Sequence, residues 1–305
     1  MKYYLLLFCM FLSGAIAIAQ TDEEYEDMDD YEEPDWNRTE WKGTFDYSYD
    51  SIEEAEWILI VTRHLEKSKY RYLDAFVDLL SKEPKTIDYP FEKYKKQADV
   101  IIKTASDGRF RSYSWDNFTG GTMIFYTNVY QYYSGDSVYT IVGSLRNKLF
   151  ATYRVSDSEP DPGEKVVGIY SIECENRSLY LVEVVNKLWS FHFANSLMAI
   201  EVKNDSILPV NLFSCLSNEV EGYEFSNGML RISYRYSEGL GDYERLENAP
   251  DFIRPYDTLV KYNPENRILY VAQVEKIEDE RESELVLNGS LIRFYFNGEC
   301  FEMLK

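Results

Sequence analysis

The sequence has few of the residues that most often hold metal ions or act as nucleophiles. Its 305 residues include two histidines and four cysteines. The histidines, His64 and His192, are far apart, and no H-E-x-x-H or C-x-x-C spacing occurs. Zinc sites and redox cysteines commonly carry such spacings. We therefore expect no metal site and no cofactor, and we interpret both histidines as structural residues.

Positive charge is also scarce. The chain carries 32 Lys and Arg against 53 Asp and Glu, which gives a net charge of −21 at pH 7. Such a charge disfavours nucleic acid and anionic membrane surfaces as partners. Part of the excess lies in residues 22–33, where nine of twelve residues are acidic. A run of this kind repels itself, so we expect residues 20–49 to be an acidic, partly disordered lead.

Long apolar runs are missing as well. The run Tyr3–Leu12 is well short of the roughly 20 residues that cross a bilayer as a helix. It follows Lys2 and is followed by small residues up to Ala19, which predicts a cleavable secretory signal peptide over residues 1–19. Cys9 lies inside the apolar run, so we do not expect a lipoprotein. The sequence thus predicts an exported protein, periplasmic or extracellular, without a transmembrane segment.

Three cysteines follow the predicted signal peptide: Cys174, Cys215 and Cys300. In an oxidising compartment one disulfide can form, in any of three pairings, and leave one thiol free. Alternatively, all three are buried as small apolar groups. We favour the second interpretation.

The best helical stretch lies within residues 50–97. Ser51 followed by Glu54 predicts a capping box, and apolar residues then recur at helical spacing. A break near residues 67–70 would divide the stretch into two packed helices, and Pro84 ends the second. We expect this segment to pack on the β domain that follows.

Residues 98–305 alternate short apolar and aromatic runs with turn signals. Eight pairs of runs flank Gly, Asn or Asp residues, which supply the positive φ that tight hairpins need. These turns are centred on residues 106–108, 134–136, 175–177, 204–205, 227–228, 263–266, 288–289 and 297–298. The pattern predicts a mainly β protein with an antiparallel, hairpin-rich domain: a barrel, a sandwich or an irregular propeller. No clean repeat period is visible, which weakens the propeller.

The densest motif is YSWDNFTGGT, residues 113–122. It lacks the Gly-Lys-Ser/Thr ending of a Walker loop. Its Asn, Asp and Gly residues suit a tight turn or bulge, which is the structural interpretation and the one we favour. The functional interpretation is a ligand-binding loop, with Trp115 as a stacking platform and Asp116, Asn117 and Thr119 as polar contacts.

The following strand adds two candidate ligand-binding residues. Tyr126 and Tyr130 share one face of the strand with Tyr132, because side chains alternate along a strand. A Tyr surface on an exported protein suits sugar rings or a protein partner. The alternative is that both faces of the strand are buried, one of them against the helices.

The run SDGRFRSYSWDNFTGGTMIFYTNVYQYYSGDSVY, residues 106–139, resembles uncharacterised exported proteins of anaerobic Gram-negative gut bacteria. These proteins share a DGxFRxYSWDxxTGGTM block. Residues 260–274 and 292–304 also look similar to them. The resemblance implies a shared fold and a periplasmic or envelope location, but no activity and no catalytic residue.

Three classes of function remain open. The leading one is a non-catalytic binding or envelope-interaction protein, whose partner is a glycan or an envelope protein; it predicts an exposed aromatic patch. The alternative is a hydrolase acting on glycans or envelope polymers, which predicts a concave pocket with two close carboxylates, one of them desolvated. With 53 acidic residues, the sequence singles out no such pair. A structural or adhesion subunit is the third class.

Overall fold

The computed structural model describes residues 51–65, 69–98, 100–116, 124–150, 163–174, 176–216, 222–236, 242–278 and 283–304. All of them belong to one compact unit. The predicted signal peptide, residues 1–19, and the predicted acidic lead, residues 20–49, lie outside this part of the chain.

The predicted helical segment is confirmed for the described residues. Its elements are α2 (Ile52–Leu65), α3 (Lys69–Lys82), the short 3-10 helix η1 (Pro84–Ile87) and α4 (Glu92–Ala98). The Ser51 hydroxyl oxygen accepts from the Glu54 backbone N–H at 3.2 Å, as a capping residue does. Within the described residues, no helix is both long enough and apolar enough to cross a membrane.

The remainder of the described chain is mainly β, as predicted. A four-stranded sheet contains β1 (Ile101–Thr104), β2 (Phe110–Asp116), β3 (Tyr126–Ser134) and β4 (Ser137–Val142). After α5 (Leu145–Phe150) comes a second sheet, whose described strands are β5 (Lys165–Cys174), β6 (Arg177–Trp189), β7 (His192–Lys203), β8 (Ser206–Pro209), β9 (Tyr223–Ser226), β10 (Met229–Arg235), β11 (Val260–Asn263), β12 (Ile268–Glu278), β13 (Ser283–Phe296) and β14 (Phe301–Met303). The short helix α6 (Asp242–Leu246) lies between β10 and β11.

The second sheet curls into a nearly closed, barrel-like form. Its main path runs β11-β12-β13-β10-β7-β6-β5. The two ends of this path approach each other. This is evident from a hydrogen bond that the Tyr170 hydroxyl of β5 donates to the Val260 carbonyl of β11 at 2.7 Å. Among the described strands the pairing is antiparallel except between β10 and β13, which meet in parallel through Arg235 and Val286.

Seven of the eight predicted hairpin turns join paired strands in the described chain. The β9–β10 turn shows why the turn residues were informative. Asn227 and Gly228 have φ of 44° and 87°, the backbone that a two-residue hairpin turn requires. A Cβ on Gly228 would lie 2.2 Å from the Val210 carbonyl oxygen, so this position also needs glycine for space.

The eighth prediction, a hairpin at Asn288-Gly289, is wrong. β13 runs straight through these residues, and residues 288–290 lie opposite Gln273 alone as a bulge. Gly289 has φ of 79°, and a Cβ there would lie 2.8 Å from the Arg245 carbonyl oxygen of α6. The positive φ therefore serves a bulge under α6 rather than a turn.

One hairpin carried no recognisable turn signal. β6 and β7 are joined at Ser190-Phe191, with Trp189 paired to His192. Neither turn residue has positive φ. Because turn prediction relied on residues that favour positive φ, this connection was missed.

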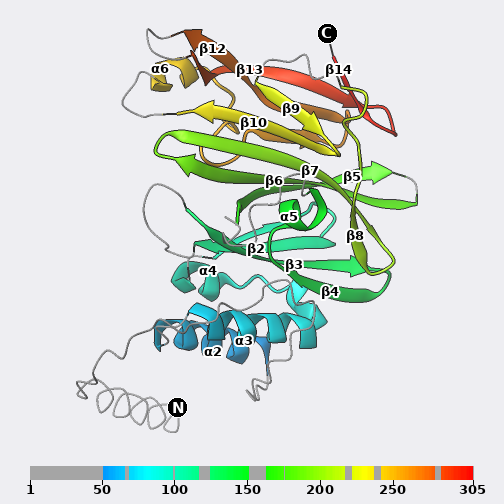
Figure 1. Cartoon of the computed structure of the whole chain (residues 1–305). Helices are drawn as coiled ribbons and strands as arrows, with labels where there is room; N and C mark the ends of the chain where they lie inside the picture. The colour runs from blue at the N-terminus through cyan, green and yellow to red at the C-terminus, as the bar shows by residue number, and fades with distance from the viewer. Residues whose placement is uncertain are drawn as a thin grey trace, which may run out of the picture. The chain divides into compact units, whose positions relative to one another are not determined.

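The described side chains form three apolar cores in successive layers, and Figure 1 shows the layers in the same order. The first lies between α2, α3 and α4 and one face of β2–β3. The second lies between the other face of β2–β3 and β5–β7. The third fills the inside of the curled sheet. The central residues of β3, β6 and β7 are therefore buried on both faces, and those of β6 and β7 are mainly apolar.

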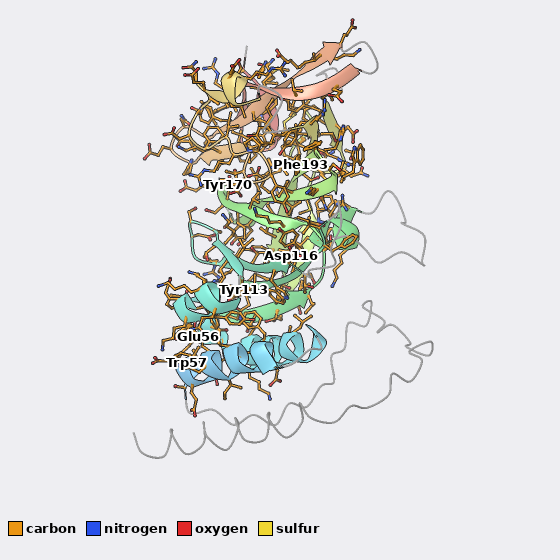
Figure 2. The ribbon with its side chains drawn as sticks, turned by 90° about the vertical axis from the view of Figure 1, so that its left-hand side faces the viewer. Glu56, Trp57, Tyr113, Asp116, Tyr170 and Phe193 are labelled. Carbon is orange, nitrogen blue, oxygen red and sulfur yellow. A yellow bond between two sulfur atoms is a disulfide. The ribbon has the colours of Figure 1, made fainter. Side chains whose placement is uncertain are left out.

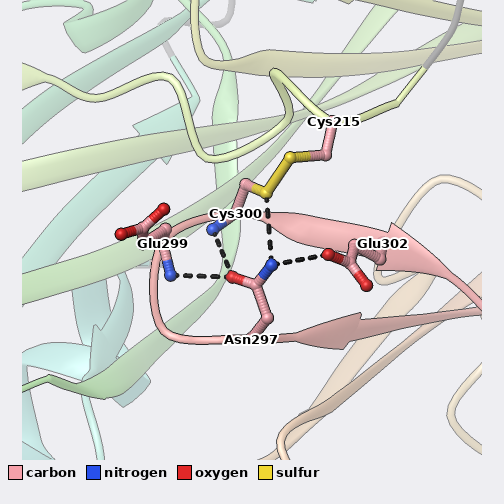
Figure 3. The surroundings of a disulfide bond; sticks show 5 residues. All are labelled: Cys215, Asn297, Glu299, Cys300 and Glu302. Carbon is pink, nitrogen blue, oxygen red and sulfur yellow. Dashed lines mark hydrogen bonds between the residues drawn. A yellow bond between two sulfur atoms is a disulfide. The ribbon is translucent and has the colours of Figure 1, made fainter.

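A disulfide joins Cys215 to Cys300, so the favoured expectation of three unpaired buried cysteines is wrong (Figure 3). Their Cα atoms lie 6.1 Å apart, and 85 residues separate them in the sequence. Cys300 lies in the β13–β14 turn, where the Asn297 side-chain oxygen accepts from the Cys300 and Glu299 backbone N–H groups. Cys174 is half-buried and carries a free thiol.

A buried arginine ties the helical layer to the sheet. Arg111 of β2 is 4% exposed and donates to the Thr86, Ile87 and Tyr89 carbonyls at 3.2, 2.7 and 2.6 Å. Its guanidinium also lies over the Phe91 and Tyr113 rings. The arginine thus supplies a donor to three carbonyls around the end of η1, of which the Thr86 carbonyl also accepts from the Tyr89 N–H at 3.2 Å.

We expect Arg111→Met to lower the free energy of unfolding by roughly 2–4 kcal/mol, because it removes three hydrogen bonds from a buried donor to those carbonyls. Urea unfolding measures the change. Arg109→Met is the matched control, since Arg109 is exposed two residues away on the same hairpin. Equal stability of the two variants would contradict the conclusion that the Arg111 hydrogen bonds stabilise the packing of the helical layer on the sheet.

The Cys215→Ala/Cys300→Ala double variant should lose about 2–4 kcal/mol of unfolding free energy, because the disulfide closes a long loop in the unfolded chain. Cys174→Ala serves as the control and should change little. Alkylation of the folded protein without reductant should label Cys174 and leave Cys215 and Cys300 unmodified. Labelling of all three thiols would show that the disulfide does not form.

Candidate functional site

The structure separates the residues of the predicted ligand loop. Trp115 is 1% exposed and packs edge-to-face on Phe76 of α3, with ring centroids 5.8 Å apart. Tyr130 is fully buried between the two sheets. Both rings therefore serve packing in the described structure, and the alternative of two buried strand faces is correct for β3. Asn117 and Thr119 lie outside the described residues.

Asp116 and Tyr126, the other two candidates, are half-buried and face each other across β2 and β3. The Tyr126 hydroxyl lies 3.0 Å from the Tyr256 hydroxyl. Lys165 at the start of β5 joins this group, 3.8 Å from an Asp257 carboxylate oxygen. Figure 2 shows Asp116 between Tyr113 of the same strand and Tyr170 of β5. The candidates thus border the segment Tyr256–Leu259, which sequence reasoning did not single out.

A buried carboxylate holds that segment from the inside of the curled sheet. Glu183 of β6 is fully buried. One of its oxygens accepts from the Leu259 backbone N–H at 2.6 Å and from the Asn195 amide at 2.9 Å. The other accepts from the Thr258 hydroxyl at 2.7 Å and lies 3.4 Å from the Tyr170 hydroxyl. The Leu259, Asn195 and Thr258 donors therefore occupy both oxygens.

Burial changes the pKa of the Glu183 carboxyl group. The pKa of Glu183 is raised to about 7, mainly because burial removes hydration from the charged form; the nearby Asp257 carboxylate acts in the same direction. The hydrogen bonds from Leu259, Thr258 and Asn195 oppose this shift, because they stabilise the charged form. Burial also lowers the pKa of Lys165, although Asp257 counteracts the effect.

Further contacts hold the same segment in an unusual backbone conformation. Tyr256 has φ of 58°, which is rare for a bulky residue. Its N–H donates to the Tyr234 hydroxyl at 2.9 Å, and its carbonyl accepts from the Lys165 ammonium at 3.3 Å. The Asn195 amide donates to the Asp257 carbonyl at 2.8 Å. The surroundings therefore determine the conformation of Tyr256.

The segment also pairs with the turn that precedes it, and residues of that turn form one wall of a solvent-open cleft. The Arg254 N–H donates to the Thr258 carbonyl at 2.9 Å, and the Asp257 N–H donates to the Arg254 carbonyl at 2.8 Å. This turn places Arg254 beside the outer surface of β11–β13. The cleft has a volume of about 560 Å³ and is lined by Pro250, Asp251, Phe252, Arg254, Lys261, Asn263, Tyr270 and Leu291.

The cleft combines apolar surface with hydrogen-bonding groups. Phe252, Tyr270 and Leu291 are half-buried, whereas Arg254 and Lys261 are exposed. The Asn263 side-chain oxygen accepts from the Glu265 N–H at 2.9 Å, which holds that amide in place. A volume of this size lies within the roughly 300–1,000 Å³ typical of small-ligand sites. The sequence held no signal for the cleft, because its residues come from a turn and from three strands.

The structure also limits which cysteine, histidine and metal-binding chemistry the described residues can perform. Cys215 is bonded to Cys300, so it carries no free thiol for nucleophilic catalysis. His192 packs its ring against Trp189, with centroids 4.5 Å apart. Within the described residues, no three His, Cys, Asp or Glu side chains gather closely enough to hold a metal ion.

The fold and site define a mainly β protein with a barrel-like sheet and an open cleft on its outer face. No family model matches the chain, and neither the search of curated proteins nor that of solved structures gave a significant match.

Stability should depend on pH through Glu183. Between pH 4.5 and about 7 the carboxyl is protonated in the folded protein and ionised in the unfolded chain, so stability from this group falls as pH rises. We expect the unfolding free energy of wild type minus that of Glu183→Gln to decrease by roughly 3 kcal/mol over this range and then level off.

Urea unfolding at pH values from about 3 to 8 tests this expectation. Glu201→Gln is the control of opposite sign, because Arg177 lowers the pKa of Glu201 through an ion pair. The stabilisation from Glu201 should be lost as pH falls through its lowered pKa. A wild-type minus Glu183→Gln difference that stays constant with pH would show that Glu183 titrates normally.

Proposed function

We propose that the protein is an exported, non-catalytic binding protein that holds a glycan in the cleft beside β11–β13. The observation that carries this proposal is the lining of the cleft, in which the Tyr270 ring is flanked by planar and charged hydrogen-bonding side chains. An aromatic ring can pack against the apolar face of a sugar while such side chains pair with its hydroxyl groups.

The disulfide supports export. Disulfides persist in oxidising compartments such as the periplasm and the extracellular space, and they are rare in the cytosol of most organisms. The bond between Cys215 and Cys300 therefore agrees with the signal peptide that the sequence predicts for residues 1–19.

The alternative, a hydrolase, has one observation in its favour. Glu183 is desolvated and lies near Asp257, which resembles a carboxylate pair. However, both oxygens of Glu183 are occupied by donors from the chain itself. Of the residues that line the cleft, Asp251 is the one carboxylate, whereas glycoside hydrolysis usually uses two. These contacts favour a structural role for Glu183 and a binding role for the cleft.

A second exposed surface offers a rival binding site. Trp189 and Phe191 at the β6–β7 turn are 53% and 47% exposed. Exposed aromatic side chains of this kind can mark an interaction surface. A binding experiment must therefore distinguish this turn from the cleft.

We expect Tyr270→Ala to weaken glycan binding about tenfold, the equivalent of roughly 1.4 kcal/mol, because it removes the stacking ring. Calorimetric titration of a glycan panel into the full protein measures the effect, with Trp189→Ala as the aromatic control. Loss of binding in Trp189→Ala alone would move the site to the β6–β7 turn. If hydrolysis products of a glycan appeared during the titration, they would support the hydrolase and contradict the non-catalytic binding protein.

A further inference from the structure

The outer face of β11–β13 carries an aligned row of two cations and an aromatic ring. Lys261 of β11 is paired with Tyr270 of β12, and Tyr270 is paired with Arg293 of β13. Side chains of directly opposite residues in an antiparallel sheet lie about 5 Å apart at their Cβ atoms and project from the same face. The Tyr270 ring is therefore flanked by a positive charge on each side.

A third cation comes from the other wall of the cleft. Arg254 lies in a turn in which its N–H donates to the Thr258 carbonyl and its carbonyl accepts from the Asp257 N–H. The neighbouring residues Tyr256–Leu259 are held by Glu183, Asn195 and Lys165. The backbone that carries the Arg254 guanidinium is thus fixed before any ligand arrives, which reduces the entropy lost on binding.

These cations are not neutralised by the protein. Across the described part of the chain, no carboxylate forms an ion pair with Arg254, Lys261 or Arg293. Asp251 is the one acidic residue in the cleft lining. The whole chain has 53 acidic and 32 basic residues and is therefore negatively charged. The cleft and the row beside it carry the opposite net charge.

Local charge decides what can bind here. At physiological ionic strength, charges beyond about 8 Å are largely screened, so a ligand in the cleft responds mainly to Arg254, Lys261 and Asp251 of the lining and to Arg293 beside Tyr270, a net positive set. Arginine pairs well with planar carboxylates and with phosphates. The Tyr270 ring and the Asn263 amide beside them suit a sugar ring with hydroxyl groups rather than a bare anion.

We infer that the ligand of the cleft is an acidic glycan, in which a sugar ring packs on Tyr270 and its carboxylate groups pair with Lys261, Arg293 and Arg254. This inference rests on the proposed glycan-binding function and adds the chemical class of the ligand.

Calorimetric titration of the full protein with three probes tests the inference. The probes are an α-1,4-linked galacturonate hexamer, the galactose hexamer of the same linkage and hexaglutamate. We expect the galacturonate hexamer to bind at least about tenfold more tightly than either of the others. Raising NaCl from about 50 to about 300 mM should weaken that binding about threefold or more.

Charge-reversal variants locate the effect. Lys261→Glu/Arg293→Glu should weaken galacturonate binding at least about tenfold. Lys276→Glu is the matched control, since Lys276 is an exposed lysine on β12 that is paired with Leu285 and not with a residue of the Lys261–Tyr270–Arg293 row. It should bind as wild type does. Both substituted residues are exposed, and urea unfolding of the double variant checks that the fold is kept.

The outcomes separate the two proposals. Equal binding of the galacturonate and galactose hexamers, unchanged in the double variant, would overturn the acidic class and leave glycan binding standing. Equal binding of hexaglutamate and galacturonate would overturn the saccharide class. Binding of no hexamer at any salt concentration, together with none from the neutral glycan panel, would overturn the proposed function itself.

Discussion

The burial of the Glu183 carboxylate is the constraint on which the described site depends. A carboxylate inside the curled sheet loses its hydration, and the loss is tolerable only because donors from β5, β7 and the segment before β11 surround both oxygens. These hydrogen bonds fix Thr258 and Leu259. Because the Thr258 carbonyl accepts from the Arg254 N–H, they also fix the turn that carries Arg254. One wall of the cleft is thus an extension of the core.

The abundance of tyrosine is explained by packing more than by surface recognition. Each buried tyrosine adds an aromatic ring to a core, and its hydroxyl can reach a polar partner at the edge of that core. The Tyr132 hydroxyl donates to the Asp205 carbonyl at 2.7 Å, and the Tyr180 hydroxyl donates to the Asp107 carboxylate at 2.9 Å. Tyrosines therefore link the four-stranded sheet to the curled sheet by both kinds of contact. Tyr270, half-buried in the cleft, is an exception.

Much of the secondary structure could be predicted from the sequence, because it depends on local rules. Ser51 before Glu54 marked the start of α2, and Asn227-Gly228 marked a two-residue hairpin. The same rules failed where tertiary contacts changed their meaning. Asn288-Gly289 has the residues of a turn, yet the close approach of α6 uses its positive φ for a bulge within β13. Ser190-Phe191 forms a turn without any positive φ.

By itself, the sequence determined the mainly β class, the helical segment and most of the strand connections, since these follow from periodicity and from turn residues. Only the tertiary structure decided which side chains meet. It buried Trp115 and Tyr130, paired Cys215 with Cys300, and brought Arg254, Lys261 and Tyr270 to one cleft. The physical reason is that these contacts join residues distant in the chain, and their register is set by the curl of the sheet rather than by local preference.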